Sequence, residues 1–518
     1  MDSQTRIGLE LTGAALLLGV LGDQMLRVTP WGLNALVWIG GLVVISGGLV
    51  YRWRATLVRA ERWLLLPVCA LALLYLGRDA ALLKLINTVA VLTVLAMGIQ
   101  RAQTARLRHH GISPFEPPGL LATSLKSILS LPRFLTRGVD WKSLSTEGRG
   151  QKAAAVGRGL LLAVPILLTF GGLLMAADAV FESLVARTFT IDPARLPGHL
   201  LLTILFAWIA GGFLYGVLMN VGKPPVTEDG APDEKRRFSL GMVEVGVVLG
   251  LVNGLFATFV LVQLSYLFGG YTTVLSTADL TLAQYARRGF FELVTVAALA
   301  LPLLMGLRRG LVVKNVQHLR LFHQLAGVHV VLLFPILASA AQRMWLYQQA
   351  YGLTELRLYV SAGIVWLAFV LAWFMGSVLR ERPERFVPGA VAAGFVLVLG
   401  LHVLNPDALI VKTNMARAVE GKPFDARYTT NLSADAVPAL LDALPSLAPE
   451  DQADVARWLL TRWHTPASGP ETWRTWNRAR SAARRAVEAN ATILRRIAAE
   501  TRQHPDPPSA EATPAAPS

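Results

Sequence analysis

Apolar stretches about as long as a membrane-spanning helix recur along the first four hundred residues of this chain. A helix needs about 20 apolar residues to cross about 30 Å of hydrocarbon, and it satisfies its own backbone in lipid. The third stretch is short and the fourth contains Lys84, so ten or twelve spans remain alternatives. The pattern predicts an all-α, polytopic transmembrane helix bundle of about eleven spans, at residues 8–26, 31–51, 63–77, 80–99, 158–178, 200–220, 242–267, 288–306, 325–342, 358–379 and 386–404.

The composition supports the same class of protein. Of the 518 residues, 53% are hydrophobic and only 16% are charged. A soluble domain of this composition would leave far more apolar surface in water than a core can hide. We therefore expect an integral membrane protein.

Lysine and arginine alternate between the loops in phase with the spans. With the N-terminus placed inside, the cytoplasmic segments hold 26 of these residues and the opposite loops hold 8. Basic loops are retained in the cytoplasm, so the N-terminus is expected to be cytoplasmic and, with eleven spans, the C-terminus extracytoplasmic. The net charge of +15 is then mostly a topology signal, and no nucleic-acid partner is expected.

Changes in polarity divide the chain into five regions. We expect an N-terminal block of about four transmembrane helices (1–99), a basic cytoplasmic linker (100–157), a seven-span core (158–404), an extracytoplasmic helical domain (405–500) and a disordered tail (501–518). The single Cys69 excludes an intramolecular disulfide, so packing must hold the outer domain together.

The outer domain is expected to end in a basic amphipathic helix near residues 471–499. Trp473, Trp476, Ala483, Val487 and Leu494 form its apolar stripe. Packing of this stripe on the two preceding helices is the favoured interpretation. Contact with the lipid surface is the alternative.

Polar residues at the outer ends of the spans form the candidate site. Each charge is costly inside a bilayer and should face protein or water. Arg288 and Glu292 lie one helical turn apart, either as a site for an anionic headgroup or ion or as a pair that anchors the helix at the interface. The full candidate outer-face cluster is Arg78, Asp79, Asp178, Tyr285, Arg287, Arg288, Glu292, Arg343, Tyr347, Arg357 and Asp407.

Signatures of catalysis are missing from the sequence. It contains no phosphate-binding glycine loop, no G-x-S-x-G and no H-E-x-x-H. We therefore expect no catalytic residues, no metal ligands and no cofactor, with His329 alone on an apolar face. Glu244, Asn253 and Gln263 in the seventh span could line a polar path, but interhelical hydrogen bonding is the favoured explanation.

Three segments carry a resemblance to a known family. These are YARRGFFEL at 285–293, RMWLYQQAYGLTELR at 343–357, and NPDALI with NLSADAVPALL within 405–441. Together they resemble a bacterial polytopic membrane family, domain of unknown function 4173, or its similar sibling numbered 4153, over roughly residues 160–445. The resemblance implies a bacterial cytoplasmic (inner) membrane location and no established activity.

Two functional classes follow from these features. The first is a non-enzymatic envelope sensor or scaffold, in which the exported C-terminal domain meets an envelope protein partner. The second is a transporter or lipid-handling protein for an anionic substrate. The sensor or scaffold is preferred, because the spans contain few charges for a coupled carrier, and membrane lipids are expected partners of either.

Overall fold

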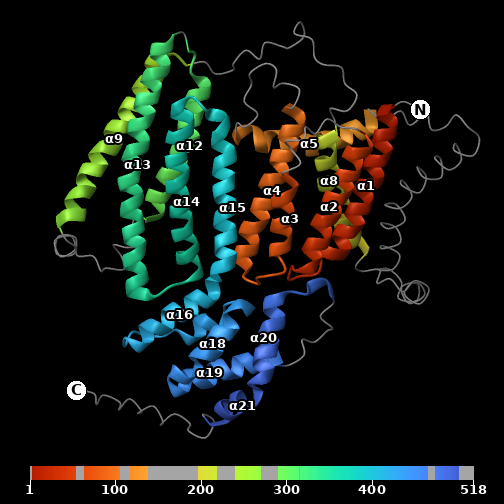
Figure 1. Ribbon diagram of the computed structural model, residues 1–518, viewed down its shortest axis with the longest axis vertical. Coiled ribbons are helices and arrows are strands. Elements are labelled where there is room, and N and C mark those ends of the chain that lie inside the picture. The colour runs from red at the N-terminus through yellow and green to blue at the C-terminus, as the bar shows by residue number, and fades with distance from the viewer. Residues whose placement is uncertain are drawn as a thin grey trace, which may run out of the picture. The chain divides into compact units, whose positions relative to one another are not determined.

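In the computed structural model, the described parts of the protein are helical (Figure 1). All the regular elements among the described residues are helical, apart from one isolated bridge between Leu240 and Leu311. The described residues are 3–53, 64–104, 117–137, 196–218, 240–269, 290–313, 315–464 and 473–500.

The chain divides into two compact units. The first comprises Met1–Tyr75, Thr88–Ala231 and the short segment Trp473–Thr475. The second comprises Leu76–Asn87, Pro232–Thr472 and Trp476–Ser518. The N-terminal turns of α4 therefore belong to the second unit, although the rest of this helix belongs to the first.

The first unit is built around two long helices that pack closely and run antiparallel. Its described helices are α1 (Ser3–Leu26), α2 (Leu33–Arg52), α3 (Leu65–Leu74), most of α4 (Ala81–Thr104), α5 (Pro117–Arg137) and α8 (Leu196–Leu218). A Cβ atom on Gly19 would lie only 2.6 Å from Ala207 Cβ, so glycine permits the close approach of α1 and α8. Leu11, Leu18 and Leu214 are buried in the resulting core.

The described residues of the second unit form five long apolar helices followed by a small helical domain. The long helices are α9 (Met242–Gly269), α12 (Phe290–Gly310), α13 (Val316–Tyr351), α14 (Glu355–Ser377) and α15 (Phe386–Leu404). Val243, Val247, Leu251 and Leu255 of α9 are exposed, as expected for a surface that faces lipid rather than water.

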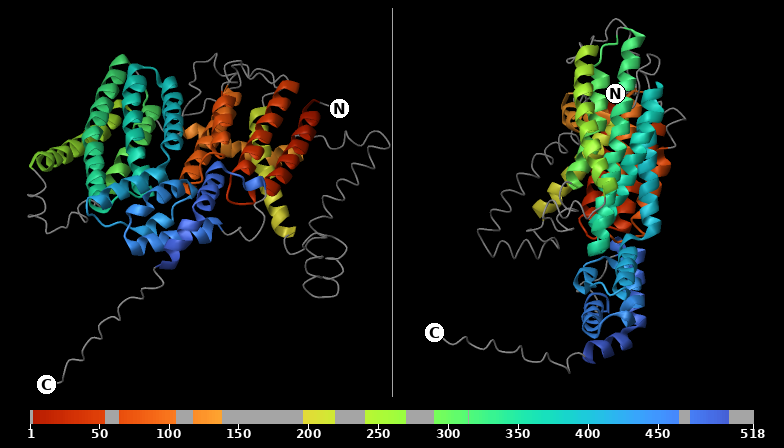
Figure 2. Two further views of the ribbon diagram at one scale, coloured as in Figure 1. Left: turned by 60° about the horizontal axis from the view of Figure 1, so that its bottom comes forward. Right: turned by 90° about the vertical axis from the view of Figure 1, so that its left-hand side faces the viewer.

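The small helical domain lies at one end of α13, α14 and α15, as Figures 1 and 2 show. Its longer helices are α16 (Pro406–Val419), α17 (Ala426–Thr430), α18 (Val437–Ala443), α19 (Pro449–Leu459), α20 (Arg478–Ala489) and α21 (Ala491–Glu500). A core that includes Val437, Val455, Leu459, Val487 and Leu494 holds these helices together.

Nine helices within the described ranges are long and apolar enough to cross a membrane. They coincide with nine of the eleven predicted spans, which confirms the polytopic helical bundle. The predicted third span is represented by α3, which has only 10 residues. The predicted fifth span, 158–178, lies outside the described residues.

The predicted terminal helix near 471–499 is two helices in the structure. α20 ends at Ala489 and α21 begins at Ala491, with Asn490 between them. Ala483, Val487 and Leu494 pack into the domain core, as the favoured interpretation requires. Trp473 and Trp476 are instead 57% and 45% exposed, so the predicted apolar stripe covers only part of this segment.

Candidate functional site

An extensive polar network of the second unit begins at Asp435, which follows α17 and is almost fully buried. Its Oδ2 accepts hydrogen bonds from the backbone N–H groups of Asp79 at 2.5 Å and Ala80 at 3.1 Å. These N–H groups stand at the N-terminus of α4, where the helix dipole favours negative charge. A carboxylate from the small helical domain therefore caps a membrane helix.

Arg78 extends the network to a second membrane helix. Its Nη1 lies 3.3 Å from Asp435 Oδ1, and its Nε donates to the carbonyl of His402 at 2.7 Å. A third bond, 3.4 Å long, reaches the carbonyl of Val403. These carbonyls belong to the last turn of α15, so the guanidinium satisfies free acceptors where the dipole favours a cation.

Asp79 lies between two buried cations. Lys84 Nζ is 2.7 Å from Asp79 Oδ1, and Arg480 Nη1 pairs with the same oxygen. The side chains of Asp79 and Lys84 are 13% and 12% exposed, and that of Arg480 is 6% exposed. Lys84 is one turn into α4, and its partner in the preceding loop explains how this span accommodates a lysine.

The N-terminus of α20 is fixed on the loop that carries these charges. Asn477 caps α20 by accepting from the N–H of Ala479, and its Nδ2 donates to the carbonyl of Arg78 at 2.9 Å. The N–H of Arg478 donates to the carbonyl of Leu76 at 2.8 Å. Two hydrogen bonds to the backbone therefore position Arg480 beside Asp79.

Asp407 lies in the first turn of α16 and is completely buried. Its Oδ2 accepts from the N–H of Ser433 at 3.0 Å, whereas Oδ1 has no hydrogen-bond partner within the described part of the chain. Burial raises the pKa of Asp407, and the charges of Asp435 and Asp79 raise it further, although the hydrogen bonds from Ser433 oppose this. The protonated form of Asp407 is thus favoured more than in an exposed aspartate.

The small helical domain also holds the connection between α13 and α14. Asn414 accepts from the N–H of Leu353 at 2.7 Å and donates to its carbonyl at 2.9 Å. Arg417 donates to the carbonyls of Gln349 and Ala350 in the last turn of α13. Tyr428 Oη accepts from the N–H of Glu355 at 2.8 Å, at the start of α14. The domain therefore contacts the ends of α4, α13 and α14 through side chains.

We call the six ionisable residues at the centre of this network the junction cluster: Arg78, Asp79, Lys84, Asp407, Asp435 and Arg480. It contains three basic and three acidic residues, so it presents no large excess of one charge. Its members serve mainly as caps and ion-pair partners. No group of three or more His, Cys, Asp or Glu residues in the described ranges could hold a metal ion. The arrangement is suited to joining helix ends.

The structure places the predicted outer-face residues in several different surroundings. Arg78, Asp79 and Asp407 meet in the junction cluster. The Arg357 guanidinium stacks over the ring of Tyr347, 4.0 Å from its centroid, and donates to the carbonyl of Gly352 in the α13–α14 turn. Arg343 lies on α13, two turns from the end of the helix.

The remaining predicted residues cannot be placed in a common site. Asp178, Tyr285, Arg287 and Arg288 lie outside the described residues. Glu292 falls within α12, but its side chain is not described. The proposed Arg288–Glu292 pair therefore stays a prediction.

Sequence patterns alone missed half of the junction cluster as site residues. Lys84 stood out only as a charge inside a predicted span, and Asp435 and Arg480 lie in amphipathic helical segments where charges are ordinary. A lysine in the first turn of a predicted span is the one signal that could have led to the cluster, because a charge there requires a nearby acid.

A separate polar pair lies within the predicted spans of the second unit. His329 Nδ1 and Asn253 Oδ1 are 2.8 Å apart, and Asn253 Nδ2 donates to the carbonyl of Leu325 at 2.9 Å. His329 is therefore not alone, contrary to the prediction. The pair links α9 to α13 and is the interhelical bonding expected for Asn253.

These features define the class of the chain: a polytopic α-helical membrane protein with a helical domain attached to the ends of its spans. Residues 65–443 match the family model "Domain of unknown function (DUF4153)", and the chain belongs to this family. The match confirms the resemblance inferred from sequence. It begins with the first residue of α3 and ends with the last residue of α18, so it includes Asp435 but not Arg480.

Comparison with known proteins adds no functional relative. No curated protein and no solved structure matches the chain.

Proposed function

We propose that this protein is a non-enzymatic sensor or scaffold of the bacterial cell envelope, embedded in the cytoplasmic membrane with its helical C-terminal domain on the outer face. The observation that carries the proposal is the attachment of this domain to the ends of α4, α13 and α14 by side-chain hydrogen bonds. Force on the domain from a bound partner would therefore act directly on the spans.

The balanced charge of the junction cluster favours this role over transport of an anion. A carrier needs a polar path through the spans, with charges exposed to the substrate. The three cations of the junction cluster instead form ion pairs with neighbouring carboxylates, and Arg78 also donates to carbonyls. The buried Asn253–His329 pair is the best support for the transporter alternative, but it joins two helices rather than facing solvent.

The proposed orientation can be tested with reporter fusions. Alkaline phosphatase, which is active only outside the cytoplasm, should be active when fused after Ala434 and silent when fused after Arg133. An inactive fusion at Ala434 would place the C-terminal domain in the cytoplasm and would contradict an outer-face role.

Site-specific photo-crosslinking in cells can test the sensor or scaffold role. A photoreactive residue at Arg485 or Ile493, both on the exposed face of the domain, should give the same discrete protein adduct. The matched control is Leu251, which is 71% exposed on the apolar surface of α9. Absence of an adduct from the domain, together with uptake of an anion by proteoliposomes, would favour the transporter instead.

A further inference from the structure

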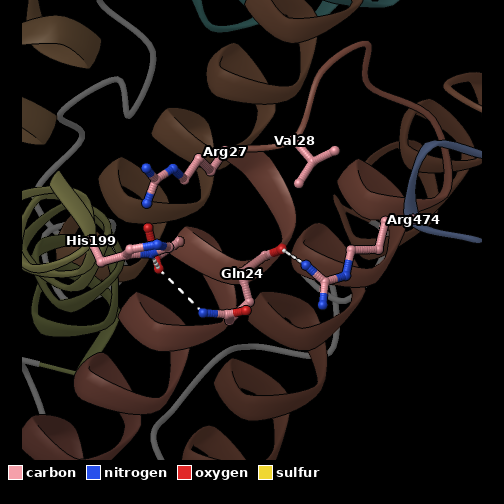
Figure 3. A pocket seen from close by; sticks show the side chains of 6 residues that line it. Gln24, Arg27, Val28, His199 and Arg474 are labelled. Carbon is pink, nitrogen blue, oxygen red and sulfur yellow. Dashed lines mark hydrogen bonds and ion pairs between the residues drawn. The ribbon is translucent and has the colours of Figure 1, made fainter. Parts of the chain in front are cut away.

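A pocket of about 270 Å³ lies in the first unit (Figure 3). Asp23, Gln24, Arg27 and Val28 line it from the end of α1 and the residues that follow, and His199 lines it from the first turns of α8. Arg474 completes the lining from a segment 450 positions beyond Gln24. Three parts of the sequence thus converge on one pocket.

The pocket carries excess positive charge. Its one acidic lining residue within the described ranges is Asp23, and Asp23 Oδ2 is already 2.5 Å from His199 Nδ1 and 3.3 Å from the amide of Gln24. Arg27 and Arg474 therefore face the pocket without a further carboxylate among the described lining residues. The first turn of α8 adds its own partial positive charge, and a guanidinium nitrogen of Arg27 lies close to Gly198 in that turn.

Capping of the C-terminal end of α1 explains the position of only one of the two arginines. Arg474 Nη1 donates to the carbonyl of Gln24 at 3.0 Å, next to carbonyls of Met25 and Leu26 that are capped by Asn34 and Trp31. Arg27 has no comparable bond among the described residues, and its side chain is exposed. The two guanidinium groups together offer the planar donor geometry that recognises phosphate oxygens.

The buried carboxylate of Asp23 gives a second indication of a ligand. Asp23 is only 3% exposed, and its Oδ1 has no hydrogen-bond partner within the described part of the chain. A buried acceptor without a partner is costly. A ligand that carries a hydrogen-bond donor beside its phosphate would match the two arginines with its phosphate and Asp23 Oδ1 with its donor.

We propose that this pocket binds the phosphate group of a phospholipid headgroup that also carries a hydroxyl or ammonium donor. The pocket lies where α1 ends and α8 begins, so it opens at the depth of the headgroups when both helices span the membrane. Arg27 and Arg474 contact the phosphate, and Asp23 orients His199 and accepts from the donor. Free inorganic phosphate is the other source of the same chemistry.

Thermal unfolding of the delipidated full-length protein in detergent distinguishes the two sources. Dihexanoyl phosphatidylglycerol below its micellar concentration should raise the unfolding midpoint, and inorganic phosphate at equal concentration should not. A response to phosphate alone would overturn the lipid assignment in favour of a soluble anion. A response to neither probe would overturn the site itself.

The Arg27→Gln variant tests whether the response arises in this pocket. It leaves the Arg474 cap of α1 intact, so the variant should fold, and the apparent affinity for the short-chain lipid should fall at least about tenfold, as expected for loss of a charged hydrogen bond. Arg496→Gln, on the exposed face of α21, is the matched control and should bind as the unmodified protein does. Equal affinity in Arg27→Gln and the unmodified protein would show that binding occurs elsewhere.

Discussion

Arg78 and Asp435 form an ion pair, with 3.3 Å between Nη1 and Oδ1, and each also caps a different membrane helix. Asp435 satisfies N–H groups at the start of α4, and Arg78 satisfies carbonyls at the end of α15. The pair therefore joins the small helical domain to two span ends through a single contact. Removing either partner leaves several buried polar groups unsatisfied.

Substitution of Asp435 should destabilise the protein strongly. Asp435→Ala removes the carboxylate partner of Arg78 and the acceptor of two backbone N–H groups, and breaking a buried pair in this way costs about 3–5 kcal/mol. The midpoint of thermal unfolding in detergent measures the effect. Asp454→Ala is the matched control, because its pair with Arg457 is mostly exposed and should contribute about 0–1 kcal/mol. Equal losses in the two variants would contradict the role assigned to Asp435.

Asp79 and Arg480 should be energetically coupled, although they lie 401 positions apart. Asp79→Ala removes a carboxylate that pairs with both Lys84 and Arg480, whereas Arg480→Ala leaves Asp79 paired with Lys84. The aspartate change should therefore cost more. The double variant should cost less than the sum of the singles by about 0.5–3 kcal/mol, the range for contacting residues. Strict additivity of unfolding midpoints would show that the pair does not form.

Asp407 should give the protein a pH-dependent stability. Its folded-state pKa is raised above the ordinary 3.8, so the folded state binds the proton more tightly than the unfolded state does. Stability should consequently fall as pH rises from about 4 through the folded pKa, and stay reduced above it.

The Asp407→Asn variant isolates this effect. The unmodified protein loses stability as Asp407 ionises, and the variant does not. The unfolding midpoint of the variant minus that of the unmodified protein should therefore increase as pH rises. Asp442→Asn, at an exposed position on α18, is the control and should leave the pH profile unchanged. Parallel profiles for Asp407→Asn and the unmodified protein would exclude Asp407 as the source.

Packing of α1 on α8 should depend on Gly19. A Cβ at this position would lie 2.5 Å from the carbonyl oxygen of Thr203, so Gly19→Ala forces the two helices apart. Gly13→Ala, two turns earlier in α1, meets nothing within 4 Å and should be neutral or stabilising by about 0.5–1 kcal/mol. Opposite shifts in the unfolding midpoint are expected, and similar shifts would argue against close packing at Gly19.

The buried Asn253–His329 pair should be replaceable by apolar residues. Asn253→Leu alone removes the partner of His329 Nδ1. It should lower the free energy of unfolding by about 0.6–2 kcal/mol, the contribution of an interhelical hydrogen bond in a membrane, and the unfolding midpoint should fall with it. The double change to leucine should recover much of this loss, because no unsatisfied polar group remains. If the double variant is less stable than either single, then the pair contributes more than helix packing.

The sequence by itself determined the class and the helical architecture of this protein. Runs of apolar residues must become helices in a bilayer, because only a helix satisfies its own backbone there. This local requirement located α1, α2 and the spans of the second unit, and the family resemblance followed from segments contiguous in the chain. The 10-residue α3 was the weakest of these elements, as its short apolar stretch suggested.

The tertiary structure alone decided which charges meet. Arg78, Asp435 and Arg480 come together across more than 350 positions because free groups at span ends require capping, and the helical domain supplies the side chains. Similarly, Arg474 reaches α1 from a distant segment and completes the pocket around Arg27. Local patterns carry no information about such long-range partners, because each charge is locally an ordinary residue at a helix end or on an amphipathic face.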